Sequence, residues 1–334
     1  MRRPRLGAGR RRAADLVTRP FADPPRLQPL TRARVADLGE PGAAWHAGLS
    51  ALLDGLAQRW GLTLGRPLPG GSASYVLTAT TAAGEPRVLK VRLPDPTLAD
   101  EARVLRAAHG CGYARLHGHV AAAELGVGEG GDALLLEHLG PTLDAAGGAP
   151  PDRLRVVART LREAWAVEPP PLVPRPEDKA VSLARSVRET DARLGGVTDP
   201  GVLRAALAAA DRLAGWDGPE VTVHGDPHLS NLLRAPDARG TGWVFVDPDG
   251  FPADPAHDLG VALRDWVTTL AEAGSGARAL HESWCRLVAE ETDLDAGRVR
   301  DWALLERVST GLYVCGFGAD RVGRPYLESA RALV

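Results

Sequence analysis

The chain has 334 residues, of which 44% are hydrophobic and 25% charged, so it can bury a sizeable core. This composition excludes a wholly disordered chain, and no apolar run approaches the roughly 18 residues that a membrane-spanning helix needs. The net charge is −2. Because there is neither a membrane span nor, as described next, a disulfide framework or a signal peptide, we expect a folded cytoplasmic protein that has no membrane partner.

The three cysteines and the arginine-rich first 40 residues indicate whether the protein stays in the cytoplasm or is exported. Cys111, Cys285 and Cys315 are odd in number and far apart, which indicates neither a disulfide framework nor a thiolate metal site. Residues 1–40 contain 10 Arg and 4 acidic residues, but the apolar segment of a signal peptide does not follow. Because no nucleic-acid-binding motif is recognisable, we expect 1–40 to be a flexible basic tail without a nucleic-acid partner.

Residues 41–138 form the first predicted domain, and its pattern of apolar residues mixes two periods. Apolar residues three and four apart indicate helices, whereas alternation bounded by turn residues indicates strands. The predicted elements are helices over 41–59 and 98–108, and strands over 74–80, 86–93 and 133–136.

Residues 139–334 form the second predicted domain, which is mostly helical and contains 22 basic and 29 acidic residues. Two short strands interrupt the helical pattern, and a proline-rich segment separates the first two helices. The predicted elements are helices over 153–167, 202–213, 264–273, 277–290 and 295–315, and strands over 221–224 and 243–246.

The segment HGDPHLSN, residues 224–231, follows the first of these strands and has the residue types of a phosphoryl-transfer site. Such a site needs a carboxylate that orients the attacking hydroxyl, and oxygen ligands that hold Mg²⁺ on the nucleotide phosphates. Asp226 and Asn231 can fill these roles, and Asp247 lies directly after the second strand, where it can bind the metal as well. Alone, Asp226 would more simply be a turn residue.

Lys90 lies in a predicted strand, and Glu101 lies eleven residues later in a predicted helix. A strand lysine held by a helix glutamate is the arrangement that places a cation on the α and β phosphates. The chain has 38 Arg and only two Lys, so a lysine at position 90 indicates a need for a compact ammonium. Gly70, Gly71 and Ser72 are either a phosphate-covering turn or an ordinary hairpin turn.

These motifs resemble the aminoglycoside phosphotransferase family of the protein-kinase-like superfamily. The resemblance spans about residues 60–320 and is strongest in VHGDPHLSNLLR and WVFVDPDGFPADPAHDLGVALRDW. Within the family, the chain is most similar to the streptomycin 6-phosphotransferase and hydroxyurea phosphotransferase group. The resemblance implies an α+β, bilobal protein-kinase-like fold with ATP in the cleft, a small antiparallel-sheet N-lobe over 41–138, and a larger, mainly helical C-lobe over 139–334.

The resemblance also implies a role for each matching residue. Asp226 would be the catalytic base, Asn231 and Asp247 magnesium ligands, and Asp258 the acceptor of hydrogen bonds from the catalytic-loop backbone. Asp249 makes the metal motif one residue longer than the usual form, and it is either a second ligand or a turn residue.

For the nucleotide, the resemblance implies that Lys90 and Glu101 are the phosphate-holding pair. The backbone of Glu137 and Leu139 would bond adenine at the hinge between the lobes. Gly225 stands where protein kinases carry Arg, and no DFG or APE segment follows, which favours a small-molecule acceptor over a protein substrate.

The leading hypothesis is an ATP- and Mg²⁺-dependent kinase of a small polar molecule, such as the aminoglycoside streptomycin. The acidic second domain, including Asp265, Glu282 and Glu306, can attract a cationic acceptor. Two alternatives stay open. One is a metal-dependent phosphohydrolase built on His224, Asp226 and neighbouring His and Asp residues, and the other is a kinase-fold binding protein without turnover.

Overall fold

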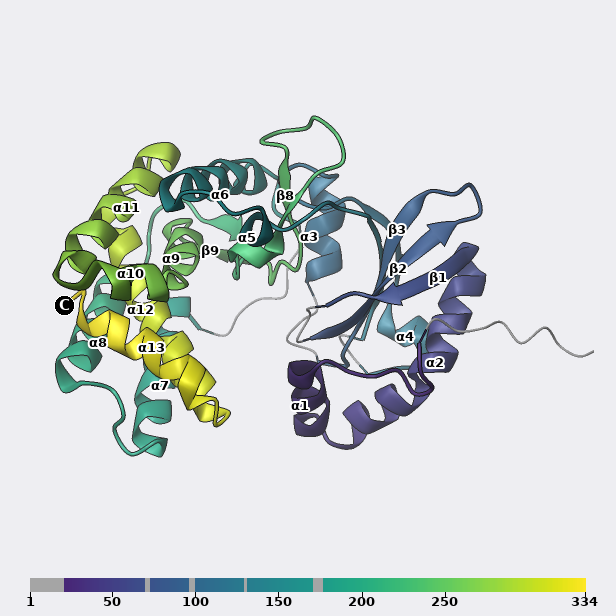
Figure 1. Cartoon of the computed structure of the whole chain (residues 1–334), viewed down its shortest axis with the longest axis horizontal. Helices are drawn as coiled ribbons and strands as arrows, with labels where there is room; N and C mark the ends of the chain where they lie inside the picture. Colours follow the sequence, from purple (N-terminus) through teal and green to yellow (C-terminus); the bar gives the residue numbers. More distant parts are fainter. Residues whose placement is uncertain (1–20, 70–72, 96–99, 129–130, 171–176) are drawn as a thin grey trace, which may run out of the picture. The chain divides into compact units, whose positions relative to one another are not determined.

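The computed structural model describes residues 21–69, 73–95, 100–128, 131–170 and 177–334 (Figure 1). The chain divides into two compact units, Met1–Leu93 and Pro94–Val334. Residues 94–138, which we predicted to be part of the N-lobe, belong to the second compact unit. The lobe boundary at residue 138 therefore stays a prediction.

The first unit combines two helices with an antiparallel meander. Its helices are α1 (Pro29–Asp37) and α2 (Glu40–Trp60), and its strands are β1 (Leu62–Pro67), β2 (Ser74–Thr81) and β3 (Pro86–Arg92). Leu49 and Leu53 on α2 are fully buried, as the helical spacing predicted. β2 pairs with β3 so that Leu77 lies opposite Leu89, and both side chains are fully buried. The predicted helix and both predicted strands of this unit are therefore confirmed.

Part of the segment expected to be a flexible tail has regular structure. Within it, α1 buries Val35 and Thr31. The Nε2 of His46 lies 2.8 Å from the carbonyl of Pro25, and the Ser50 hydroxyl donates to Asp23 at 2.7 Å. Contacts with α2 thus give a regular structure to residues whose local sequence pattern did not predict one. Residues 1–20 lie outside the described part of the chain.

The second unit begins with short elements. These are α3 (Glu101–Ala108), β4 (Leu116–Val120), α4 (Ala122–Leu125), β5 (Ala133–Glu137) and α5 (Leu143–Ala146). β4 and β5 pair antiparallel, and all five residues of β5 are buried, as its apolar run predicted. β4 was not predicted because its sequence, LHGHV, lacks an apolar alternation.

Most of the second unit is helical, and α12 lies in its middle (Figure 1). The helices are α6 (Pro150–Trp165), α7 (Lys179–Arg193), α8 (Pro200–Leu213), α9 (Ala256–Arg264), α10 (Val267–Ala273), α11 (Ala277–Thr292), α12 (Ala296–Gly316) and α13 (Asp320–Arg331). α12 packs against α7, α8, α9, α11 and α13. Among the described helices, none is long and apolar enough to cross a membrane.

Two small antiparallel ladders lie within this helical unit. β6 (Val221–Val223) pairs with β9 (Phe251–Ala253), and β7 (Leu232–Arg234) pairs with β8 (Trp243–Phe245). The predicted strands over 221–224 and 243–246 are confirmed. Their partners β7 and β9 were not predicted, since each has three residues and forms only because a distant strand supplies its hydrogen bonds.

α9 and α12 approach closely at Gly260. A Cβ atom built on Gly260 would lie 2.4 Å from the Cβ of Trp302 and 2.7 Å from its carbonyl carbon. Because both neighbours belong to the rigid body of α12, glycine is the residue that permits this approach.

A buried ion pair joins the same two helices. His257 on α9 is fully buried, and its Nε2 lies 2.9 Å from Oε1 of Glu306 on α12. Burial lowers the pKa of His257, but its contacts with Asp258 and Glu306 outweigh burial and raise it. Burial raises the pKa of Glu306, but the hydrogen bond from His257 and nearby positive charges lower it to about 2. Both shifts therefore favour the charged forms of the two side chains.

Replacing Gly260 with Ala should destabilise the protein by about 1–3 kcal/mol, because α9 must move away from α12 to admit a methyl group. Urea unfolding monitored by tryptophan fluorescence measures this change. Gly55→Ala is the control, since Gly55 lies within α2 and a Cβ there meets nothing within 4 Å. Equal stability of Gly260→Ala and wild type would contradict the close approach.

Replacing Glu306 with Gln should cost about 3 kcal/mol near pH 6, because it leaves the charged His257 without its partner. Since the pKa of Glu306 is lowered from 4.5 to about 2, its contribution is present above pH 4.5 and is lost as pH falls toward 2. The stability difference between wild type and Glu306→Gln should therefore shrink below pH 4.5. Urea unfolding from pH 3 to 6, with the exposed Glu290→Gln as control, tests this, and parallel pH curves for wild type and Glu306→Gln would contradict it.

Candidate active site

Two loops connect the small ladders and lie beside each other. Residues 224–231 leave β6 and enter β7, whereas residues 246–250 leave β8 and enter β9, so the two loops run in opposite directions. The amide of Asp249 donates to the carbonyl of His224 at 2.8 Å, and the amide of Val246 donates to the carbonyl of Asn231 at 2.9 Å. These bonds bring the predicted catalytic and metal-binding segments together.

His224 supports the first loop from below. Its side chain is fully buried, its Nδ1 accepts a bond from the amide of Asp226 at 3.1 Å, and its Nε2 donates to the carbonyl of Val246 at 2.9 Å. The ring also packs against Tyr113 and Phe245. Because both ring nitrogens are engaged, His224 has no lone pair for a metal, which removes a ligand that the phosphohydrolase alternative requires.

Asp258 holds the same loop through its backbone. Its carboxylate is fully buried and accepts bonds from the amides of His224 and Gly225, at 2.8 and 2.9 Å, and from the indole of Trp165, at 2.9 Å. Burial raises the pKa of Asp258, but the contact with His257, the nearby His224 ring and the hydrogen bond from Trp165 lower it below its ordinary value. The predicted role of Asp258 as acceptor for the loop backbone is confirmed.

Gly225 is required by the shape of this loop. Its φ is +91°, and a Cβ atom would lie 2.7 Å from the Cβ of Asp249 and 2.8 Å from the ring of Phe251. A side chain here would push the two loops apart, which explains why this position cannot carry the Arg of protein kinases.

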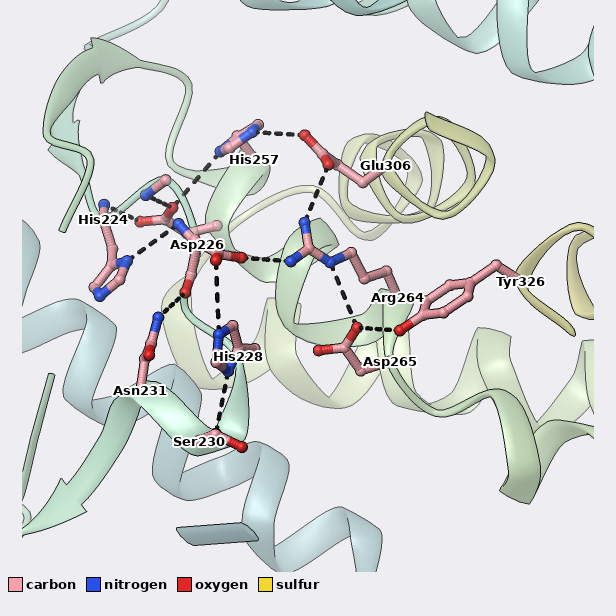
Figure 2. A network of polar contacts seen from close by, with 12 residues as sticks. His224, Asp226, His228, Ser230, Asn231, His257, Arg264, Asp265, Glu306 and Tyr326 are labelled. Atoms are coloured by element: carbon pink, nitrogen blue, oxygen red, sulfur yellow. Dashed lines mark hydrogen bonds and ion pairs between the residues drawn. The ribbon is translucent and has the colours of Figure 1, made fainter. Parts of the chain in front are cut away.

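Asp226 presents its carboxylate at the end of the turn that His224 and Asp258 hold. The side chain is 38% exposed, which leaves room for a substrate group. One carboxylate oxygen, Oδ1, forms an ion pair with Arg264, and the other, Oδ2, lies 3.6 Å from Nε2 of His228. The backbone carbonyl of Asp226 accepts from Nδ2 of Asn231 at 3.1 Å (Figure 2).

Asn231 lies beside Asp226, and Asp247 and Asp249 lie in the adjacent loop. Asn231 is 8% exposed, and because its nitrogen is bonded to Asp226, its amide oxygen is the atom left for a metal. Asp247 has a φ of +59°, a left-handed conformation that a residue other than glycine seldom adopts and that often occurs at functional sites. Within the described residues, no group of three or more His, Cys, Asp or Glu is placed to hold a metal by itself.

The predicted nucleotide-binding residues lie on different elements. Lys90 lies on β3 and Glu101 begins α3, and their side chains are 5% and 3% exposed. The amide of Glu137 donates to the carbonyl of Arg115 at 3.1 Å, Leu139 is partly buried, and the bonding of either residue to adenine stays a prediction. Lys90 and Glu101 belong to different compact units, so their pairing stays a prediction, and Gly70, Gly71 and Ser72 lie outside the described residues.

Sequence reasoning missed the group of charges around Arg264. Its guanidinium contacts Asp226, and it lies 3.4 Å from both Asp265 and Glu306 (Figure 2). The expectation that Glu306 attracts a cationic acceptor is wrong, because Glu306 is buried and already paired with His257 and Arg264. Among 38 Arg in this chain, nothing in the spacing distinguishes position 264.

Comparisons with known proteins agree with this geometry. The family model described as aminoglycoside/hydroxyurea antibiotic resistance kinase matches residues 59–316. The chain is 28% identical over 296 residues to streptomycin 6-kinase of Streptomyces griseus, which covers 88% of this chain and 92% of the relative.

Two solved structures are similar in fold. The ethanolamine kinase of Plasmodium vivax has a TM-score of 0.57 and 11% identity, and the match covers 81% of this chain and 82% of that one. An aminoglycoside phosphotransferase of Streptomyces rimosus, solved with ADP and streptomycin, has a TM-score of 0.50 and 21% identity, covering 78% of this chain and 98% of that one.

These matches confirm the predicted α+β, bilobal protein-kinase-like fold. They also confirm the prediction of a small-molecule kinase, which uses ATP to phosphorylate a hydroxyl group. The chain belongs to the aminoglycoside/hydroxyurea antibiotic resistance kinase family.

Proposed function

We propose that the protein transfers the γ-phosphate of Mg²⁺–ATP to a hydroxyl of an aminoglycoside, with streptomycin as the first candidate acceptor. The observation that supports this proposal is Asp226, a half-exposed carboxylate on a rigid loop, whose carbonyl is bonded to the amide of Asn231 and whose loop lies next to the one that contains Asp247. Similarity to two streptomycin 6-kinases, over most of the length of each, supports streptomycin as the acceptor.

In this mechanism Asp226 is the catalytic base. Its exposed carboxylate accepts a hydrogen bond from the acceptor hydroxyl and takes the proton as the new oxygen–phosphorus bond forms. At the same time the bond from the γ phosphorus to the oxygen that bridges the β and γ phosphates breaks, and ADP leaves. The loop is held on three sides, by His224 at the amide of Asp226, by Asn231 at its carbonyl and by Asp258 at the two preceding amides. Such rigidity keeps the hydroxyl in line with the phosphate, which is the main contribution a protein makes to this reaction.

The donor set fits Mg²⁺ on a nucleotide. Magnesium prefers oxygen ligands and is commonly held by one or two carboxylates together with substrate phosphates and water. The amide oxygen of Asn231 and the carboxylate of Asp247 would be the protein ligands. When bound, the ion would neutralise charge on the β and γ phosphates. Lys90, held by Glu101, would contact the α and β phosphates, and Glu137 and Leu139 would bond adenine.

Asp226→Asn should lower kcat by about 10³-fold, because the amide cannot take the proton of the acceptor hydroxyl. The dissociation constant for ATP should change little, since no nucleotide contact is removed. ADP release with ATP, Mg²⁺ and streptomycin measures kcat, and mass spectrometry identifies the phosphorylated acceptor. The exposed Asp217→Asn is the matched control and should behave as wild type.

Other outcomes of the same assay separate the alternatives. Release of inorganic phosphate without a phosphorylated acceptor would indicate a hydrolase. Binding of ATP without turnover, across streptomycin, other aminoglycosides, hydroxyurea and simple sugars, would indicate a binding protein. Full activity of Asp226→Asn would remove Asp226 from the mechanism.

Asp247→Asn and Asp249→Asn should differ in their need for magnesium. If Asp247 is the ligand and Asp249 mainly closes the turn through its amide, Asp247→Asn alone should raise the half-saturating Mg²⁺ concentration, by about tenfold or more. Titration of activity with MgCl₂ at saturating ATP tests this. An equal rise in both variants would make Asp249 a second ligand.

A further inference from the structure

Arg264 is the cation that contacts the catalytic base. It is the last residue of α9, its side chain is 15% exposed, and it forms an ion pair with Oδ1 of Asp226. On its other sides it lies 3.4 Å from Oδ1 of Asp265 and 3.4 Å from Oε2 of Glu306. A single guanidinium thus lies among three carboxylates (Figure 2).

Two of these carboxylates are themselves held from behind. Glu306 bonds to His257 at 2.9 Å, and Asp265 accepts from the hydroxyl of Tyr326 at 3.2 Å. These partners come from α9, α12 and α13, so helices far apart in the sequence surround the guanidinium. Asp265 and Glu306 therefore hold the guanidinium of Arg264 on the sides that do not contact Asp226.

The charges of this group favour a permanent cation at position 264. Burial lowers the pKa of Arg264, but the charges of Asp226, Asp265 and Glu306 outweigh burial and raise it. The guanidinium is planar and has donors on three nitrogens, each of which faces a different carboxylate here. A lysine has all its donors on one nitrogen, so it does not match three carboxylates that face three separate nitrogens of a planar group.

We propose that Arg264 is a positioning residue for the catalytic base, and that Asp265 and Glu306 hold it in place. With Oδ1 bound to Arg264, the carboxylate of Asp226 cannot rotate freely, and Oδ2 is the oxygen that faces the acceptor hydroxyl. This inference rests on the proposed function, in which Asp226 takes the proton of that hydroxyl.

Displacing the base should lower kcat more than it weakens substrate binding, because the acceptor hydroxyl loses its alignment with the phosphate. Arg264→Ala should lower kcat by about 100-fold and leave the dissociation constant for ATP nearly unchanged. Arg264→Lys should recover only part of kcat, since an ammonium keeps the charge but not the three contacts. Arg188→Ala, an exposed change on α7, is the control and should keep the activity of wild type.

Chemical rescue distinguishes positioning from a general loss of stability. Removing the side chain leaves a space surrounded by three carboxylates, which added guanidinium at millimolar concentration should occupy. Guanidinium should raise kcat of Arg264→Ala but not of wild type or Arg188→Ala. Urea, which has a similar shape without charge, should have no effect.

The same site can be measured without turnover. Guanidinium at these concentrations should raise the Tm of Arg264→Ala, because a ligand that binds only the folded state stabilises it. The rise should be smaller in the double variant Arg264→Ala/Asp226→Asn, which lacks one of the three charges.

The two proposals fail in different ways. If wild type is active and Asp226→Asn is not, while Arg264→Ala keeps the kcat of wild type, the positioning role is overturned and the proposed function stands. Restoration of Tm by guanidinium without any gain in kcat would likewise overturn it, leaving Arg264 a structural residue. If guanidinium raises Tm but wild type phosphorylates no acceptor, the proposed function fails, and with it the role of Arg264 toward a base.

Discussion

The buried carboxylate of Asp258 accepts hydrogen bonds from the first two amides of the catalytic loop, and the geometry of the site depends on these bonds. A buried ionised group is costly unless it is fully paired, so the loop and Asp258 stabilise each other. Trp165 supplies a third donor, and His257 lies 3.6 Å away. Through this carboxylate, the start of α9 is bonded to the loop that carries Asp226.

The same helix reaches Asp226, the proposed catalytic base, at both ends. Asp258, in its first turn, fixes the backbone before Asp226, and Arg264, at its last residue, contacts the side chain of Asp226. Helix α9 can do this only because Gly260 brings it against α12, where Glu306 pairs with both His257 and Arg264. Close helix packing and buried charge pairing thus act on the same few residues, which makes the site rigid.

Much of the chemistry was visible in the linear order of residues. Asp226 and Asp247 lie within a few residues of the ends of two short apolar strands, and the structure confirms those strands and brings their loops side by side. The strands β4, β7 and β9 escaped prediction, and each has only three to five residues. They exist because a partner strand completes their hydrogen bonds, and no local pattern reports such a partner.

The sequence by itself determined the family of the chain and the reaction, because the residues that move a phosphate must have particular chemical types in a particular order. Tertiary structure alone decided which of the many charged residues act with them. Arg264 and Glu306 lie 42 residues apart in a part of the chain that contains many arginines and many acidic residues. Nothing in the sequence distinguishes these two from the others. Glu306 meets Arg264, which in turn contacts Asp226, because α12 packs against α9. Such a contact depends on the shape of both helix surfaces and not on any spacing within one.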